Sequence, residues 1–392
     1  MKLPLQFRLL WPVISWGLVY PPAMFAETVP SGSTMLVYIG TYTGAKSKGI
    51  YVSRFDPAAG RLTSPELAVT TPSPSFLAMH PGKRILYAAG ETTNLGGKPV
   101  GAVSAFKLDE KNGQLTLLNR ESSGGAGPCH LAVDATGKCL LVANYGSGSI
   151  AALPIQADGS LAAPGAVIQH QGSSVNPQRQ AGPHAHFVTP DPLNRFALTC
   201  DLGLDQVLVY RFDPSKGSLV ANVPPFADVK PGSGPRHLAF DPSGRFVFLI
   251  NEMGSTFTVF AYDAKQGALK ELQTISTLPE GFTGNSTCAE VQVHPSGKFV
   301  YGSNRGHDSI AVFGFDAASG KLTCLQHQFT QGKTPRHFAL DPAGNWLLAE
   351  NQDSDNIVVF RVDAKTGRLS PAGQTVSVGA PVCAVFVPLN QR

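Results

Sequence analysis

Along most of the chain, short apolar runs of about 4–7 residues alternate with turns rich in Gly, Pro and Asp, a pattern typical of β-strands. The runs come in groups of four that share one phrase: Pro-x-x-apolar-Ala-x-Asp/His-Pro-x-Gly-Lys/Arg, an apolar run ending in Asn or Glu, Val/Ile-x-Val-Phe, and Asp-x-x-x-Gly-x-Leu. Each group therefore predicts a four-stranded antiparallel sheet. The phrase starts at Pro74, Pro128, Pro183, Pro235, Cys288, Pro335 and Pro381.

The copies follow one another at intervals of about 52 residues, which is typical of a repeat architecture. The last copy begins at Pro381 and runs out of chain, and the segments 36–39, 50–52 and 56–62 supply the strands that it lacks. The pattern predicts an all-β fold, a seven-bladed β-propeller with the first blade closed by N- and C-terminal strands. An open solenoid is the less favoured alternative because it needs polar caps at its ends.

Composition agrees with this architecture and narrows the range of partners. The chain has 41 Gly and 31 Pro among 392 residues and only 15% charged residues, which excludes a helical bundle and a disordered chain. The net charge of +4 arises without any run of like charges, so neither a nucleic-acid groove nor a membrane-binding basic arm is predicted. We expect a small-molecule partner and a monomer or weak dimer.

The N-terminal residues differ from the rest of the chain. Lys2 and Arg8 precede the apolar run 9–20, and Ala26 ends a stretch with a small-residue cleavage site. This pattern predicts a signal peptide over residues 1–26, a linker over 27–34 and the propeller domain over 35–392. The protein is then exported to the periplasm, or remains cytoplasmic if the leader is not functional.

Six cysteines, at 129, 139, 200, 288, 324 and 383, show no C-x-x-C or other zinc-type spacing. A core of this size does not need disulfides, so we expect buried free thiols rather than bridges.

The repeat also assigns residues to the two faces of the propeller. The Asp-Pro-x-Gly and Asp-x-x-x-Gly turns share one face, so the start of each innermost strand and the loop after the second strand lie on the other. Titratable side chains that crowd at a concave mouth indicate a functional site. On that face lie Glu91, His130, Asn144, Tyr145, His184, His186, Asp201, Arg236, His237, Asn251, Glu252, Glu290, Asn304, Arg305, His307, Arg336, His337, Glu350 and Asn351.

Several members of this set have ordinary structural explanations. The recurring Asn is often a turn former, and the repeated Pro-Arg-His at 235–237 and 335–337 is compatible with blade scaffolding. The residues that break the repeat, His184, His186, Glu252 and Arg305, are the sharper candidates. His184 and His186 would present both rings on one face of a strand, where a third ligand such as Glu252 would complete a zinc site. No Gly-x-Ser-x-Gly elbow or Walker loop occurs.

Six motifs together give the chain a resemblance to the lactonase-type seven-bladed propellers, which include bacterial 6-phosphogluconolactonases and a fungal carboxymuconate lactonising enzyme. The motifs are 36–43 (LVYIGTYT), 182–186 (GPHAH), 234–237 (GPRH), 251–252 (NE), 303–310 (SNRGHDSI) and 335–338 (PRHF). The resemblance implies a catalytic group of one His, two Arg and one Glu, and no cofactor or metal. By motif these are Arg236, Glu252, Arg305 and either His184 or His186.

This chemistry suits the opening of a sugar lactone, because a neutral His accepts a proton from water while two guanidiniums stabilise the oxyanion and the carboxylate product. We expect His237, Asn304, His307, Arg336, His337, Glu290 and Asn144 to contact the substrate. An exported enzyme would meet an unphosphorylated lactone rather than cytosolic 6-phosphogluconolactone. The alternatives are a muconate-type lactonising cycloisomerase and a propeller that binds a ligand without turnover.

Overall fold

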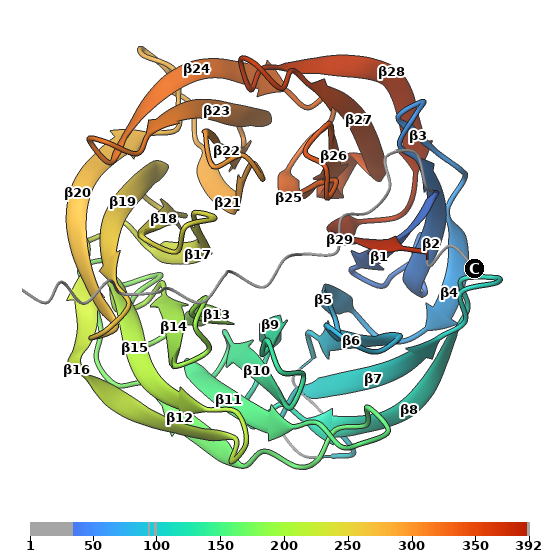
Figure 1. The fold of residues 1–392 in the computed structure, drawn as a ribbon, viewed down its shortest axis with the longest axis horizontal. Coiled ribbons are helices and arrows are strands. Elements are labelled where there is room, and N and C mark those ends of the chain that lie inside the picture. Colours follow the sequence, from blue (N-terminus) through green and yellow to red (C-terminus); the bar gives the residue numbers. More distant parts are fainter. Residues whose placement is uncertain (1–33, 93–94, 98–99, 390–392) are drawn as a thin grey trace, which may run out of the picture.

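A computed structural model describes residues 34–92, 95–97 and 100–389, so the predicted signal peptide and most of the linker lie outside the described residues. The described residues form seven antiparallel sheets arranged radially around a central channel (Figure 1). This confirms the predicted all-β propeller. Apart from the 3₁₀ turn η1 (Gln352–Ser354), the regular structure in this part of the chain is β-strand.

Each blade runs from an innermost to an outermost strand in chain order, apart from the first. The second blade consists of β5 (Pro74–Met79), β6 (Ile85–Gly90), β7 (Ala102–Leu108) and β8 (Leu115–Ser122). The third consists of β9 (Pro128–Val133), β10 (Cys139–Asn144), β11 (Ser149–Pro154) and β12 (Ala166–Gln169). The fourth consists of β13 (Ala185–Pro190), β14 (Phe196–Asp201), β15 (Gln206–Asp213) and β16 (Ser218–Asp228).

The fifth to seventh blades repeat the same order. The fifth blade consists of β17 (Pro235–Phe240), β18 (Phe246–Asn251), β19 (Thr256–Asp263) and β20 (Ala268–Ser276). The sixth consists of β21 (Thr287–Val293), β22 (Phe299–Arg305), β23 (Ser309–Asp316) and β24 (Lys321–Phe329). The seventh consists of β25 (Pro335–Leu340), β26 (Trp346–Asn351), β27 (Asn356–Val362) and β28 (Leu369–Ser377).

The first blade joins the two ends of the chain, as predicted. The C-terminal strand β29 (Pro381–Pro388) is innermost and pairs with β1 (Met35–Thr41), followed by β2 (Gly49–Asp56), which pairs with both β3 (Arg61–Leu62) and β4 (Glu66–Thr70). Seven hydrophobic clusters hold adjacent sheets together, and one of them joins β1 of the first blade to β27 of the last. The pairing covers the sheet edge that an unclosed ring would expose.

Buried tyrosines tie neighbouring blades together on the tight-turn face. Tyr38, Tyr87 and Tyr301 occupy equivalent second strands, and their hydroxyls donate to the carbonyls of Gly113, Gly159 and Gly367 at 2.9 Å. Burial raises the pKa of all three phenols, so they remain protonated donors.

Removing one of these hydroxyls should cost stability. In Tyr301→Phe the carbonyl of Gly367 loses its donor in a buried site, so we expect the free energy of unfolding to fall by about 1–3 kcal/mol. The matched control is Tyr51→Phe, since Tyr51 is only half-buried and its hydroxyl accepts one exposed bond from Lys48. Urea unfolding followed by tryptophan fluorescence measures both variants, and equal losses would contradict this role for Tyr301.

Candidate active site

A β-bulge recurs near the start of the innermost strand of each blade. The register shifts there in all seven sheets. A bulge re-aims a side chain out of the normal alternation, and here it turns one residue per blade toward the channel mouth. We call these residues the bulge ring: Ser75, Cys129, His186, Arg236, Ala289, Arg336 and Val382.

In the second to seventh blades, the residue after the member of the bulge ring contacts side chains of other blades across the channel. Aromatic contacts join side chains from different blades: ring centroids lie 4.2 Å apart for Phe76 and His130, 4.0 Å for His130 and Phe187, and 5.3 Å for His130 and His237. These side chains fill the channel. We call them the axial ring: Phe76, His130, Phe187, His237, Glu290 and His337.

A cavity of about 260 Å³ opens on this face, and below it lies a water-sized niche of about 10 Å³. The two share the lining residues Glu91, Cys129 and Arg336. The cavity is further lined by Tyr145, Arg179, His186, Glu252 and Arg305. The niche is further lined by Ser75, Phe76, Arg236, His237, His337 and Val382.

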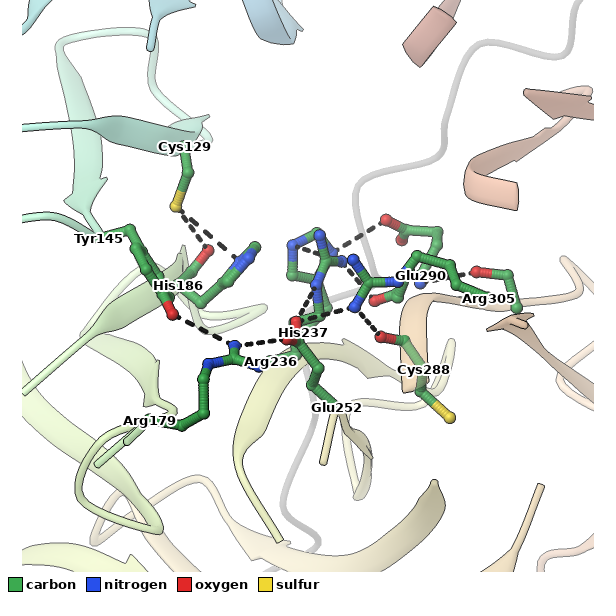
Figure 2. A network of polar contacts seen from close by, with 12 residues as sticks. Cys129, Tyr145, Arg179, His186, Arg236, His237, Glu252, Cys288, Glu290 and Arg305 are labelled. Atoms are coloured by element: carbon green, nitrogen blue, oxygen red, sulfur yellow. Dashed lines mark hydrogen bonds and ion pairs between the residues drawn. The ribbon is translucent and has the colours of Figure 1, made fainter. Parts of the chain in front are cut away.

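Three arginines converge on Glu252, which follows strand β18 (Figure 2). One carboxylate oxygen, Oε1, accepts from Nη2 of Arg179 at 2.8 Å. The other, Oε2, lies 3.0 Å from Nε of Arg236 and 2.9 Å from Nη2 of Arg305. Burial favours the neutral acid, but Arg305 and Arg236 outweigh it and hold the pKa of Glu252 far below its usual range. Glu252 is thus a fixed anion that orients guanidiniums.

Arg236 is the most deeply placed of these cations, with only 2% of its surface exposed. Its Nη1 donates to the carbonyl of Ala289 at 2.6 Å and lies 3.4 Å from Nε2 of His237. Burial and the neighbouring charges of Arg305 and Arg336 lower its pKa to about 10, so it stays charged at neutral pH. Arg305 anchors the far wall by donating to the carbonyl of Cys288 at 2.7 Å.

A second group of polar residues includes Arg336 and Glu91, which also line the cavity. The guanidinium of Arg336 lies 5.3 Å from the ring centre of Tyr42, whose hydroxyl donates to Glu91 at 2.8 Å. Four arginines and two glutamates therefore surround the cavity and niche among the described residues, leaving an excess of positive charge. Such a site suits a ligand that carries or develops negative charge.

The two candidate histidines occupy different environments. His186 is in the bulge ring, lines the cavity and is 5% exposed, with Nδ1 3.9 Å from Sγ of Cys129. Burial, and then Arg236, lower its pKa well below 6.5, so it is neutral at pH 7. His184 precedes β13, stacks on Tyr145 at 4.5 Å and directs Nδ1 to the Tyr145 carbonyl. The structure brings His186 to the cavity, while His184 supports its wall.

Three predicted substrate contacts lie in the axial ring instead. His237, Glu290 and His337 are at most 6% exposed and bond to one another and to Glu350 rather than lining the main cavity. His237 and His337 reach the niche, and Arg336 alone of the predicted binding residues lines the cavity itself. The bulge explains this difference in position, because in the second to seventh blades it places one residue of each innermost strand in the bulge ring and the next residue in the axial ring.

The structure also places Asn144, Asn304 and His307 away from the cavity. Each asparagine is fully buried, and its Nδ2 bonds a serine five residues on, Ser149 and Ser309 respectively, across the turn between the second and third strands. Both asparagines are therefore turn formers, which is the structural explanation that the repeated sequence offered. His307 bonds Ser309, packs against Phe282 and Phe329, and lines neither the cavity nor the niche.

Sequence reasoning missed a catalytic-site candidate, Arg179, and assigned no role to Tyr145, Glu91, Cys129 or Tyr42. Arg179 lies in the connection between β12 and β13, outside the repeated phrase, and its guanidinium reaches both Tyr145 and Glu252. The unusual length of this connection was the available signal. Glu91 and Tyr145 follow their second strands at the position that Glu252 occupies in its blade.

The predicted pairing of His184 and His186 on one face of a strand is wrong, because the first precedes β13 and the second is its bulged residue. Within the part of the chain that the structure describes, no three His, Cys, Asp or Glu side chains are grouped as a metal site would require. All six cysteines are free thiols, five buried and Cys324 exposed.

A sequence profile described as "Lactonase, 7-bladed beta-propeller" matches residues 36–386, which is nearly all of the propeller. The chain belongs to this family. A 6-phosphogluconolactonase of Bacillus subtilis is 36% identical over 74% of this lactonase-family chain and 80% of its own length.

Solved structures show the same relationship. A periplasmic gluconolactonase of Pseudomonas aeruginosa is 36% identical and superposes with a TM-score of 0.86, covering 91% of this lactonase-family chain and all of the other. A protein of Lactobacillus plantarum, described without a function, is 33% identical with a TM-score of 0.84 over 90% and 99% of the two chains. Among the described residues, no helix is long and apolar enough to cross a membrane.

Proposed function

We propose that this protein is a hydrolase that opens a sugar lactone by metal-free, general-base attack of water on the ring ester. The observation that carries the proposal is the cavity itself, in which a buried, neutral His186 faces guanidiniums that Glu252 holds in place. A neutral imidazole accepts protons, and fixed cations stabilise negative charge where it develops.

The residues divide the reaction between them. His186 accepts a proton as water attacks the ring carbonyl, and the arginines stabilise the resulting oxyanion. When the ring C–O bond breaks, the imidazolium returns the proton to the departing alkoxide, which gives the open hydroxy acid. Glu252 is a poor base because both its oxygens already face guanidiniums. It orients Arg236 and Arg305 instead.

The substrate class follows from charge, size and relatives. A cavity of about 260 Å³ is large enough for one sugar ring, and its positive excess suits the carboxylate product or a phosphate. Relatives named 6-phosphogluconolactonase and periplasmic gluconolactonase support a gluconolactone-type ring. If residues 1–26 direct export, as the sequence predicts, the substrate is unphosphorylated.

The test is hydrolysis of δ-gluconolactone and 6-phosphogluconolactone by the mature chain, measured as acid release with and without EDTA. We expect turnover on at least one lactone, insensitivity to EDTA, and loss of turnover in the Arg236→Ala/Glu252→Ala double variant. Activity lost to EDTA would contradict the metal-free mechanism. Turnover of a muconate-type diacid but of neither lactone would identify a lactonising enzyme, and ligand binding without turnover a binding propeller.

A further inference from the structure

Beneath the cavity, three members of the axial ring and Glu350 of β26 form a buried chain of alternating carboxyl and imidazole groups. Nδ1 of His237 lies 2.9 Å from Oε2 of Glu290, and the same oxygen is 3.7 Å from Nε2 of His337. Nδ1 of His337 lies 2.8 Å from Oε2 of Glu350. The mechanism above uses none of these four groups, yet the chain ends at Nη1 of Arg236, 3.4 Å from Nε2 of His237.

The partners of His237 fix which ring nitrogen carries the proton. Arginine has only donors, so the nitrogen that faces Arg236 must offer a lone pair. The proton of a neutral His237 then sits on Nδ1 and is donated to Glu290, which must be an acceptor. The Glu290 backbone is itself held, because its N–H donates to Oγ of Ser303 at 3.0 Å.

Protonating Glu290 reverses this arrangement. When the added proton is on Oε2, the oxygen that faces Nδ1 of His237, the acid donates its O–H to that nitrogen. The proton of His237 then moves to Nε2, where it meets the N–H groups of Arg236. Two donors then face each other in a buried site, and a buried donor without an acceptor costs about 1–3 kcal/mol. The guanidinium of Arg236 would lose one of the three contacts that hold it, the others being Glu252 and the Ala289 carbonyl.

We propose that Glu290 and His237 are positioning residues that hold the Arg236 guanidinium in its working orientation, and that protonation of Glu290 releases it. The catalytic part of this proposal rests on the proposed function, whereas the tautomer switch of His237 does not. Neither residue lines the cavity of about 260 Å³. The carboxylate of Glu290 orients the imidazole of His237, and that imidazole in turn orients the guanidinium of Arg236. In a catalytic triad the imidazole would face a nucleophile in the place that Arg236 takes here.

The electrostatic surroundings of Glu290 make the switch relevant near neutral pH. The charged and titratable groups facing it are His237 and Arg236 on β17, His337 on β25, Glu350 on β26 and the thiol of Cys383 on β29. Burial outweighs the attraction of His337 and Arg236 and raises the pKa of Glu290 to about 7. Meanwhile burial lowers the pKa of His237 well below 6.5, so His237 stays neutral while Glu290 titrates.

The first test reads the tautomer directly and requires no substrate. Nitrogen-15 imidazole spectra of the full chain, with His237 assigned by comparison with His237→Gln, should show protonated Nδ1 above about pH 7 and protonated Nε2 below it. In Glu290→Gln the pH-dependent change should vanish. A His237 tautomer that is constant from pH 5.5 to 8.5 in the wild type would overturn the proposal.

The second test uses lactone hydrolysis. Wild-type kcat/KM should fall on the acid side with an apparent pKa near 7, and Glu290→Gln, whose amide accepts from His237 but does not titrate, should remove that limb. Because the raised pKa means that ionisation of Glu290 opposes folding between about pH 4.5 and 7, this variant should not unfold at a lower temperature than the wild type at pH 8.

The matched control is Asp341→Asn, which removes another buried carboxylate of raised pKa, at a tight turn of the seventh blade. Both oxygens of Asp341 accept backbone N–H bonds, from Ala343 and Trp346, and the amide of asparagine keeps only one acceptor. This variant should therefore lower the unfolding temperature despite the raised pKa, and leave the pH profile unchanged. If Glu290→Gln behaves like this control, Glu290 is structural and the proposal fails. If the wild type shows the tautomer switch but hydrolyses no lactone, the proposed function fails and the positioning pair stands.

Discussion

Replacement of His186 by glutamine is expected to lower kcat for lactone hydrolysis by about 10²- to 10⁴-fold, the range that a general base contributes. His186 is the neutral, buried imidazole that lines the cavity, whereas Glu252 is fully engaged with arginines. Steady-state kinetics at pH 8 measure the effect. KM should change little, because the amide of glutamine still occupies the wall and accepts hydrogen bonds.

The matched control for this prediction is His184→Gln. His184 stacks on Tyr145 and contacts its carbonyl, so its loss should loosen the cavity wall and raise KM without a comparable fall in kcat. A larger loss of kcat in His184→Gln than in His186→Gln would mean that the base was wrongly assigned. Because the pKa of His186 lies well below 6.5, its protonation should limit the rate only in acid, below the limb assigned to Glu290.

Replacement of Glu252 by glutamine is expected to abolish measurable turnover and to lower the free energy of unfolding by about 3–5 kcal/mol. Breaking a buried ion pair leaves its partner charge uncompensated, and here Arg236 is 2% exposed and Arg305 is also largely buried. The orientation of both guanidiniums would be lost with the charge. Urea unfolding and the lactone assay measure the two effects.

Two further variants distinguish the effect of charge balance on stability from the loss of turnover. In Arg236→Met/Glu252→Gln the innermost cation is removed together with the anion, so stability should recover in part while turnover stays absent. The control Glu271→Gln removes an exposed glutamate of β20 and should change neither property. A fully active Glu252→Gln variant would contradict the assigned role.

The pH dependence of stability gives the same prediction an independent check. The pKa of Glu252 is far below its unfolded value of 4.5, so its contribution to stability is present in full above about pH 4.5 and is lost as the pH falls below it. The stability gap between wild type and Glu252→Gln should therefore narrow progressively in acid. A gap that is constant from pH 7 to 3 would show that the loss comes from packing rather than from charge.

Repetition in the sequence was sufficient to predict the architecture. The recurring turn and strand phrase identifies seven sheets, and the incomplete copy at Pro381 with the strands near residue 36 predicts closure by β29 and β1. The same phrase assigns each loop to a face, because turn chemistry and strand alternation are local properties. For this reason Arg236, Glu252, Arg305 and Arg336 were all expected on the face where the cavity lies.

The depth of each residue and its partners from other blades follow from packing that the sequence pattern does not encode. A bulge shifts the register by one, so His186 reaches the cavity, while His237 and Glu290 fall into the axial ring one residue deeper. Arg179 joins Glu252 from a connection outside the repeat, across 73 positions of sequence. Such contacts depend on packing between blades rather than on local pattern. Turn and strand signals therefore establish the fold and the face, whereas the site arises only when the blades pack together.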